Sequence, residues 1–179
     1  DVALHETDAA ERVARARDAY DCVAISYYPN SADIAWMLDE ERAPLWQAFV
    51  DSGLVCNLQV TPPNYGTLLT LAQRYPNVPF LCNHLGLPSS LDPADVTYGG
   101  LDEAAALDNV FVKASAFYAA ANTSWDPRCA RALGYFTSLV NALGAERILW
   151  GTDWPPTSRH LTYRQALEVV RAFAPTLDD

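Results

Sequence analysis

Two side chains with the capacity for acid, base or metal chemistry stand at the ends of apolar segments. Asp153 ends the segment RILWGTD just before a turn, and His84 follows Asn83 in PFLCNHL. A carboxylate in such a setting is costly to bury unless it binds a cation or hydrogen-bond donors, or caps a helix. An imidazole there can ligate a metal or polarise a carbonyl, although a lone histidine is often structural. His84 and Asp153 are therefore the main candidates for a catalytic pair.

Further polar residues near these segments could bind a substrate. Lys113, the only lysine of the chain, lies among apolar neighbours and could hold an anionic group, or could pair with an acid. Arg159 and His160 follow the turn after Asp153 and could either cover a substrate or remain solvated. Weaker candidates for the wall of a site are Tyr27, Tyr28, Asn57 and Gln59.

Five short apolar runs must position these residues. The runs are rich in β-branched and aromatic residues, which predicts strands. They cover residues Cys22–Tyr28, Leu54–Val60, Pro79–Leu85, Asn109–Ala116 and Arg147–Asp153. Helical patterns separate them at Asp8–Tyr20, Pro44–Asp51, Asn64–Tyr75, Asp126–Leu143 and Thr162–Phe173, and Asp8 with Glu11 has the spacing of a capping box. This alternation predicts an α/β fold with a parallel sheet.

The polar positions favour a barrel over an open sheet. Strand alternation predicts that His84 shares a face with Phe80 and Cys82, that Lys113 shares one with Ser115, and that Asp153 shares one with Leu149 and Gly151. Polar groups near the carboxyl ends of strands converge at the mouth of a (β/α)8 barrel. A complete barrel needs at least about 200 residues, so 179 residues predict only part of one.

Composition narrows the class of protein. The chain is half apolar and has a net charge of −10, which argues against binding nucleic acid or a membrane surface. Its four cysteines form no C-x-x-C pair, which favours buried reduced thiols in a cytoplasmic protein. No nucleotide-binding glycine loop, G-x-S-x-G or H-E-x-x-H motif is present. Because the chain starts at Asp1 and its only methionine is Met37, we expect a processed form or a fragment.

Four segments together resemble the amidohydrolase-related (amidohydrolase 2) family of TIM-barrel hydrolases, which includes lactonases and decarboxylases. They are WQAFVDSGLVCNLQV, LAQRYPNVPFLCNHLGLP, NVFVKASAFY and GAERILWGTDWPP, and the combination of H-L-G-x-P with a later G-T-D-W-P is fairly specific. The resemblance implies that residues 1–179 form one incomplete domain, in which the five runs are strands four to eight and the first three βα units are missing.

The same resemblance implies roles for individual residues. His84 corresponds to the histidine that ends the sixth strand, Lys113 to the lysine of the seventh, and Asp153 to the base or metal ligand that ends the eighth. The fifth strand reads Asn57–Leu58–Gln59 where many members carry a metal-binding histidine, and the first-strand H-x-H is absent. These departures favour the lactonase-like branch, in which metal binding is often dispensable.

The function expected from these observations is hydrolysis of a lactone, or of a similar cyclic ester or amide, by water activated by Asp153. His84 would polarise the carbonyl, and the substrate-binding residues would be Lys113, Arg159, Gln59 and Tyr28. His84 and Asp153 are also the expected ligands of a single zinc or manganese ion, if one is used. The alternatives are a metal-dependent decarboxylase of the same family and an inactive fragment or binding module. A small-molecule substrate is the expected partner, and the two open sheet edges are compatible with a homo-oligomer.

Overall fold

A parallel five-stranded sheet forms the centre of the computed structural model, which describes residues 2–29, 32–88, 100–121 and 126–174. Its strands are β1 (Ala24–Tyr27), β2 (Val55–Leu58), β3 (Phe80–Cys82), β4 (Val110–Ala114) and β5 (Ile148–Trp150). Each strand pairs with the one before it in the chain, and all four pairings are parallel. A doubly wound sheet reverses its strand order at a switch point, whereas a barrel does not. The order therefore confirms the α/β class and a partial TIM-barrel-like structure.

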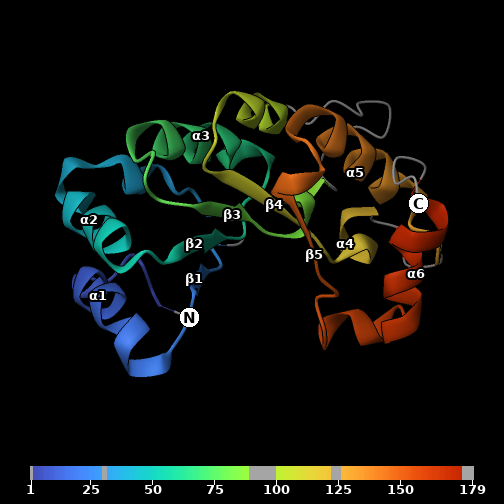
Figure 1. Ribbon diagram of the computed structural model, residues 1–179, viewed down its shortest axis with the longest axis horizontal. Coiled ribbons are helices and arrows are strands. Elements are labelled where there is room, and N and C mark those ends of the chain that lie inside the picture. Colours follow the sequence, from blue (N-terminus) through green and yellow to red (C-terminus); the bar gives the residue numbers. More distant parts are fainter. Residues whose placement is uncertain (1, 30–31, 89–99, 122–125, 175–179) are drawn as a thin grey trace.

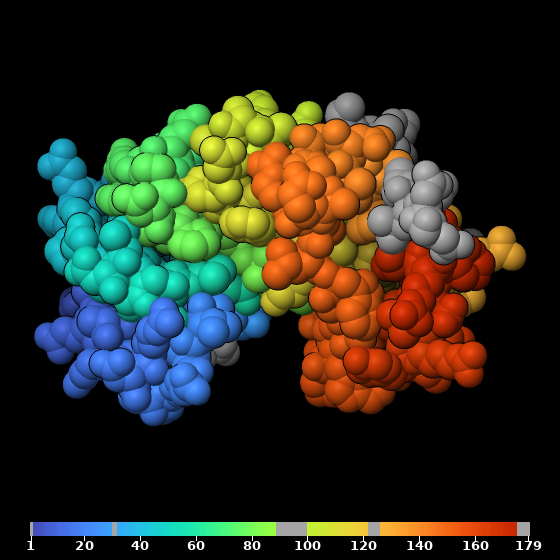
Figure 2. All heavy atoms as spheres, viewed as in Figure 1, coloured from blue at the N-terminus to red at the C-terminus, as the bar shows by residue number. Residues whose placement is uncertain are grey.

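Six helices flank the curved sheet in the described part of the chain. They are α1 (Ala9–Tyr20), α2 (Ala43–Ser52), α3 (Tyr65–Arg74), α4 (Phe117–Ala121), α5 (Ala130–Leu143) and α6 (Tyr163–Phe173). Short 3₁₀ turns occupy Ala35–Leu38, Glu40–Arg42, Pro62–Asn64, His84–Gly86, Leu101–Ala106, Ala145–Arg147 and Pro156–Arg159. In Figure 1, α1, α2, α3 and α5 follow one another around the outside of the sheet. Figure 2 shows a crescent whose N-terminal and C-terminal ends face each other across a gap.

The apolar core lies between the strands and these helices. Trp46 of α2 is fully buried, and its ring packs on Phe49, Tyr75 and Phe80 at centroid distances of 5.8, 5.4 and 5.7 Å. Its indole N–H donates to the Met37 carbonyl oxygen at 3.0 Å, so the polar atom of the buried ring is satisfied. This cluster joins α2, α3 and β3 into one packed unit and so fixes the position of β3.

The first helix, α1, lacks the capping box that the sequence predicts for it. Asp8 precedes α1, but its side chain makes no capping bond and instead accepts from Arg12 Nε at 2.8 Å. The predicted capping box at Asp8 is therefore wrong. A capping box does begin α6, where the Thr162 hydroxyl accepts from the Gln165 N–H and the Gln165 side chain accepts from the Thr162 N–H.

The cysteines are free thiols, and Cys56, Cys82 and Cys129 are buried. Burial raises the pKa of Cys82 to about 12 and that of Cys129 to about 11, so both are protonated at neutral pH. Within the described ranges, we found no helix with the length and hydropathy needed to cross a membrane.

Candidate active site

A cavity of about 380 Å³ lies at the carboxyl edge of the sheet. Its lining includes a residue from beyond the carboxyl end of every strand, namely Tyr28 after β1, Gln59 after β2, His84 after β3, Ala116 after β4 and Asp153 after β5. Leu87, Tyr118, Ala119 and Pro156 complete the wall. The carboxyl edge is where parallel α/β barrels form their active sites. This cavity is therefore the candidate active site.

His84 and Asp153 lie together in this cavity. His84 Nε2 is 3.7 Å from Asp153 Oδ1, and the two side chains are 12% and 22% exposed. His84 Nδ1 lies 2.8 Å from the Ser115 hydroxyl of the neighbouring strand segment. Burial lowers the pKa of His84, and the charge of Lys113 lowers it further, while Asp153 opposes the shift. A neutral imidazole thus faces a carboxylate across a partly solvated space.

Backbone geometry brings His84 into the cavity. Phe80 and Cys82 are fully buried, and Phe80 packs against Trp46 of α2, so this face of β3 points toward the helices. The expectation that His84 shares that face is wrong. The strand ends at Cys82, and His84 adopts a left-handed φ of 54°, which breaks the alternation and brings its ring to Ser115. Cys82 and His84 therefore do not form a nucleophile pair.

Asp153 is held by a tyrosine that sequence reasoning did not single out. The Tyr118 hydroxyl of α4 donates to Asp153 Oδ2 at 2.7 Å. The Tyr118 ring stacks on His160, with a centroid distance of 4.4 Å and an interplanar angle of 14°. Burial raises the pKa of Tyr118, and the hydrogen bond to Asp153 adds to the rise, so the phenol is a donor at neutral pH. The available signal was the position of Tyr118 at the end of NVFVKASAFY, directly after the strand.

The other predicted site residues divide into two groups. Tyr28 and Gln59 line the cavity, as described above, whereas Lys113 and Arg159 are not part of its wall. Lys113 is half-buried on β4, where burial lowers its pKa and the nearby charge of Asp153 opposes the shift. Arg159 is exposed, and its charge opposes the rise in the pKa of Tyr118. Both cations therefore act on the Asp153 region through their charge.

Of the weaker wall candidates, Tyr27 and Asn57 have other contacts and do not line the cavity. The Tyr27 hydroxyl lies 3.3 Å from His5 Nδ1, and its ring packs edge-on against Trp36, so it belongs to a separate aromatic cluster. Asn57 is buried, and its Nδ2 donates to the Ser26 hydroxyl at 2.8 Å. Neither side chain is part of the lining.

Two side chains of the candidate site, from His84 and Asp153, are of the kinds that bind transition metals. His84 and Asp153 offer an imidazole and a carboxylate, and no group of three or more His, Cys, Asp or Glu side chains able to hold an ion occurs in the described part of the chain. A catalytic zinc ion usually takes three protein ligands. The described donor set is therefore incomplete for such an ion.

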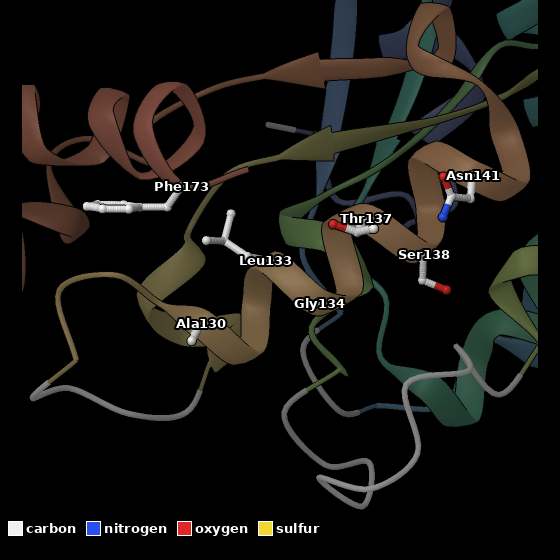
Figure 3. A pocket seen from close by; sticks show the side chains of 7 residues that line it. All are labelled: Ala130, Leu133, Gly134, Thr137, Ser138, Asn141 and Phe173. Atoms are coloured by element: carbon white, nitrogen blue, oxygen red, sulfur yellow. The ribbon is translucent and has the colours of Figure 1, made fainter. Parts of the chain in front are cut away.

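A larger hollow of about 630 Å³ lies on the outer surface of α5, beside α6 (Figure 3). It is lined by Ala130, Leu133, Gly134, Thr137, Ser138, Asn141 and Phe173. None of these side chains is charged or titrates near neutral pH, so the smaller cavity is the better candidate for chemistry.

Two stretches that follow strand ends, Gly86–Gly100 and Phe117–Trp125, are long for β-to-α connections, and such length predicts a lid. Most of Gly86–Gly100, with Tyr98, lies outside the described residues. In the second stretch Phe117–Ala121 forms α4, and residues 122–125 lie outside the described ranges. The short helix carries Tyr118 to the cavity.

Comparison with known proteins gives the family. The family model described as Amidohydrolase matches residues 2–179. The chain belongs to the amidohydrolase family. This result confirms the family that the H-L-G-x-P and G-T-D-W-P motifs indicated.

Several amidohydrolases are similar to this chain. L-fucono-1,5-lactonase of Burkholderia ambifaria is 30% identical over 156 residues, which cover 86% of this chain and 53% of the lactonase. An amidohydrolase structure from Burkholderia multivorans has a TM-score of 0.79 at 20% identity, and the match covers 94% of this chain and 62% of the amidohydrolase chain. A putative 2-pyrone-4,6-dicarboxylic acid hydrolase from Pseudomonas putida has a TM-score of 0.68 at 23% identity, and the match covers 84% of this chain and 55% of the hydrolase chain. The chain thus spans about half the length of the curated lactonase.

Proposed function

We propose that this amidohydrolase-family chain carries the catalytic residues of a hydrolase that opens a lactone or a similar cyclic ester. The observation that carries the proposal is the 3.7 Å approach of the His84 imidazole and the Asp153 carboxylate in a single cavity at the carboxyl edge of the sheet. The 30% identity to L-fucono-1,5-lactonase supports a lactone as the substrate class.

Asp153 is the general base in the proposed reaction. Its carboxylate takes a proton from a water molecule as the water oxygen forms a bond to the lactone carbonyl carbon. The ring C–O bond then breaks, and the departing ring oxygen takes up the proton that Asp153 held. The products are a hydroxyl group and a carboxylic acid, and Asp153 returns to its ionised form.

His84 polarises the lactone carbonyl. When the Ser115 hydroxyl donates to Nδ1, the neutral ring carries its proton on Nε2, which faces the cavity and donates to the carbonyl oxygen. The donation strengthens as negative charge builds on that oxygen in the transition state. Lys113 adds a positive charge near the same region, because its charge acts on both His84 and Asp153.

The remaining predicted residues bind the substrate. Tyr28 and Gln59, which follow β1 and β2, contribute polar side chains to the cavity wall. Arg159 contributes positive charge from the loop after Asp153. In this proposal β1 to β5 correspond to strands four to eight of the family's barrel. The amidohydrolase of Burkholderia multivorans has also been crystallised with zinc, and in this chain His84 and Asp153 would supply two of the ligands of such an ion.

The substitution Asp153→Asn tests the proposal, because it keeps the shape of the side chain and removes the base. Release of acid from a panel of sugar lactones and pyrone lactones is measured for the wild-type chain, for Asp153→Asn and for Asp18→Asn. Asp18 is an exposed residue of α1, so its substitution makes the same change of charge away from the cavity.

We expect Asp153→Asn to lower kcat by about 10²–10⁴-fold and Asp18→Asn to leave it unchanged. Equal turnover by Asp153→Asn and wild type would refute the role of Asp153. If the wild-type chain hydrolyses no lactone but releases carbon dioxide from an aromatic carboxylic acid, the result would instead favour a decarboxylase. No turnover of either kind would favour an inactive fragment or binding module.

A further inference from the structure

The Asp153 carboxylate is restrained through one of its oxygens, and the other is directed toward the catalytic space. Oδ2 accepts the Tyr118 hydroxyl at 2.7 Å, while Oδ1 faces His84 Nε2 at 3.7 Å, which is beyond a normal hydrogen bond. The tyrosine therefore fixes the rotation of the carboxyl group without blocking the oxygen that faces His84.

Tyr118 is itself held on both sides. Its ring stacks on His160, which lies beyond the β5 loop, and its own helix α4 starts directly after β4. The phenol and the carboxylate come from positions 35 residues apart in the chain. The contact thus ties α4 to the end of β5, and a change in the ring position would be transmitted to the carboxylate.

From this geometry we infer that Tyr118 is a positioning residue for Asp153, which orients the carboxylate in the reaction proposed above. The inference rests on the proposed role of Asp153 as the base. The hydrogen bond to Oδ2 fixes the rotation of the carboxyl group and keeps Oδ1 aligned with the attacking water.

The charged and titratable groups that face Asp153 come from each neighbouring element. They are His84 after β3, Lys113 of β4, Tyr118 of α4 and Arg159 of the 3₁₀ turn Pro156–Arg159. Of these, only Tyr118 has a hydrogen bond to the Asp153 side chain in the described part of the chain. The substitution Tyr118→Phe removes this one donor and leaves the ring and its stacking partner in place.

The test compares wild type, Tyr118→Phe and the control Tyr20→Phe, in which an exposed tyrosine of α1 loses its hydroxyl. The first readout needs no substrate: the carboxyl ¹³C chemical shift of Asp153, assigned by its loss in Asp153→Asn, is compared between the variants at one neutral pH. The second is the separate measurement of kcat and KM, and thermal unfolding reports whether each variant folds.

In Tyr118→Phe we expect the carboxyl ¹³C resonance of Asp153 to shift at constant pH, because the carboxylate loses its hydrogen-bond donor. We expect kcat to fall about tenfold with KM within twofold, and Tyr20→Phe to match wild type. An unchanged carboxyl resonance in a folded Tyr118→Phe variant would overturn the inference. If the resonance moves but no lactone is hydrolysed even by wild type, the contact with Asp153 stands and the proposed function fails.

Discussion

At the residue scale, the candidate site concentrates unusual backbone conformations. His84, Ala116 and Asp153 have φ values of 54°, 51° and 61°, and they follow the carboxyl ends of three neighbouring strands. A left-handed conformation costs a non-glycine residue about 1–2 kcal/mol. Such residues persist where the surrounding structure fixes them, and they cluster at functional sites. Here the conformation places two of the three side chains, His84 and Asp153, beside each other.

The single lysine gives a direct measure of charge in the site. Burial lowers the pKa of Lys113 below 10.5, and Asp153 opposes this shift. In protein labelled with ¹³C at lysine Cε, one lysine resonance is expected, with a midpoint below 10.5. Asp153→Asn should move it still lower because the opposing charge is lost. A midpoint that does not respond to Asp153→Asn would contradict the electrostatic coupling of the two groups.

The lowered pKa of Lys113 also makes the stability of the folded state depend on pH. Because the folded state binds the Lys113 proton less tightly than the unfolded state does, stability increases as pH rises from the folded pKa to about 10.5. Below that window both states are protonated, and the folded state carries the full cost of the buried charge. Lys113→Met should therefore raise the unfolding temperature at pH 7, as measured by calorimetry, while weakening the binding of anionic substrates.

At the scale of the elements, the turn after β3 depends on close packing against α3. Gly86 has a φ of +72°, and its carbonyl oxygen accepts the buried Tyr65 hydroxyl at 2.6 Å. A Cβ at this position would lie 2.7 Å from that hydroxyl oxygen and 2.9 Å from Leu101 Cδ2. The turn that presents His84 thus requires a residue without a side chain.

Substitution of glycine by alanine should have opposite effects at two positions. Gly86→Ala should lower the free energy of unfolding by about 2–3 kcal/mol because it combines strain with overpacking. Gly134→Ala, inside α5 with no atom within 4 Å of the new Cβ, should raise it by about 1 kcal/mol. Urea unfolding of both variants measures the difference. Equal stabilities would show that the turn can relax away from Tyr65.

At the scale of the whole molecule, the sheet has two unpaired edges in its described part. β1 pairs with β2 alone and β5 with β4 alone, and the two ends of the crescent face each other across the gap in Figure 2. Large apolar side chains are exposed along both edges: Val23 and Tyr20 are 75% and 81% exposed near β1, and Leu149 and Trp150 are 44% and 40% exposed on β5. Open edges with exposed apolar residues favour association.

We therefore expect the isolated chain to self-associate through these edges as its concentration rises. Val23→Lys and Leu149→Lys should reduce the association without lowering the unfolding temperature, because both side chains are already exposed. Phe173→Lys, at an exposed apolar residue of α6, is the control. Size-exclusion chromatography with light scattering measures the mass. A monomer at all concentrations would argue against edge association.

Local sequence patterns were sufficient to place most elements. Strand and helix periods located all five strands and five of the six helices of the described chain, although the strands are shorter than predicted. They also placed His84 and Asp153 at the carboxyl ends of predicted strands, and in the structure both residues lie just beyond those ends. Periodicity and capping depend on neighbours a few residues apart, which a single sequence displays directly.

Only the tertiary structure decided how the site is assembled. Alternation placed His84 on one face with Phe80 and Cys82, but those two residues point toward the helices, and a left-handed backbone after Cys82 brings His84 to the cavity instead. The role of Tyr118 depends on a contact with a residue 35 positions later, and no local pattern encodes that contact. Sequence determined which residues stand at the edge of the sheet, because this depends on where strands end. Their mutual distances depend on strand pairing and on individual backbone angles, which are set when the chain packs as a whole.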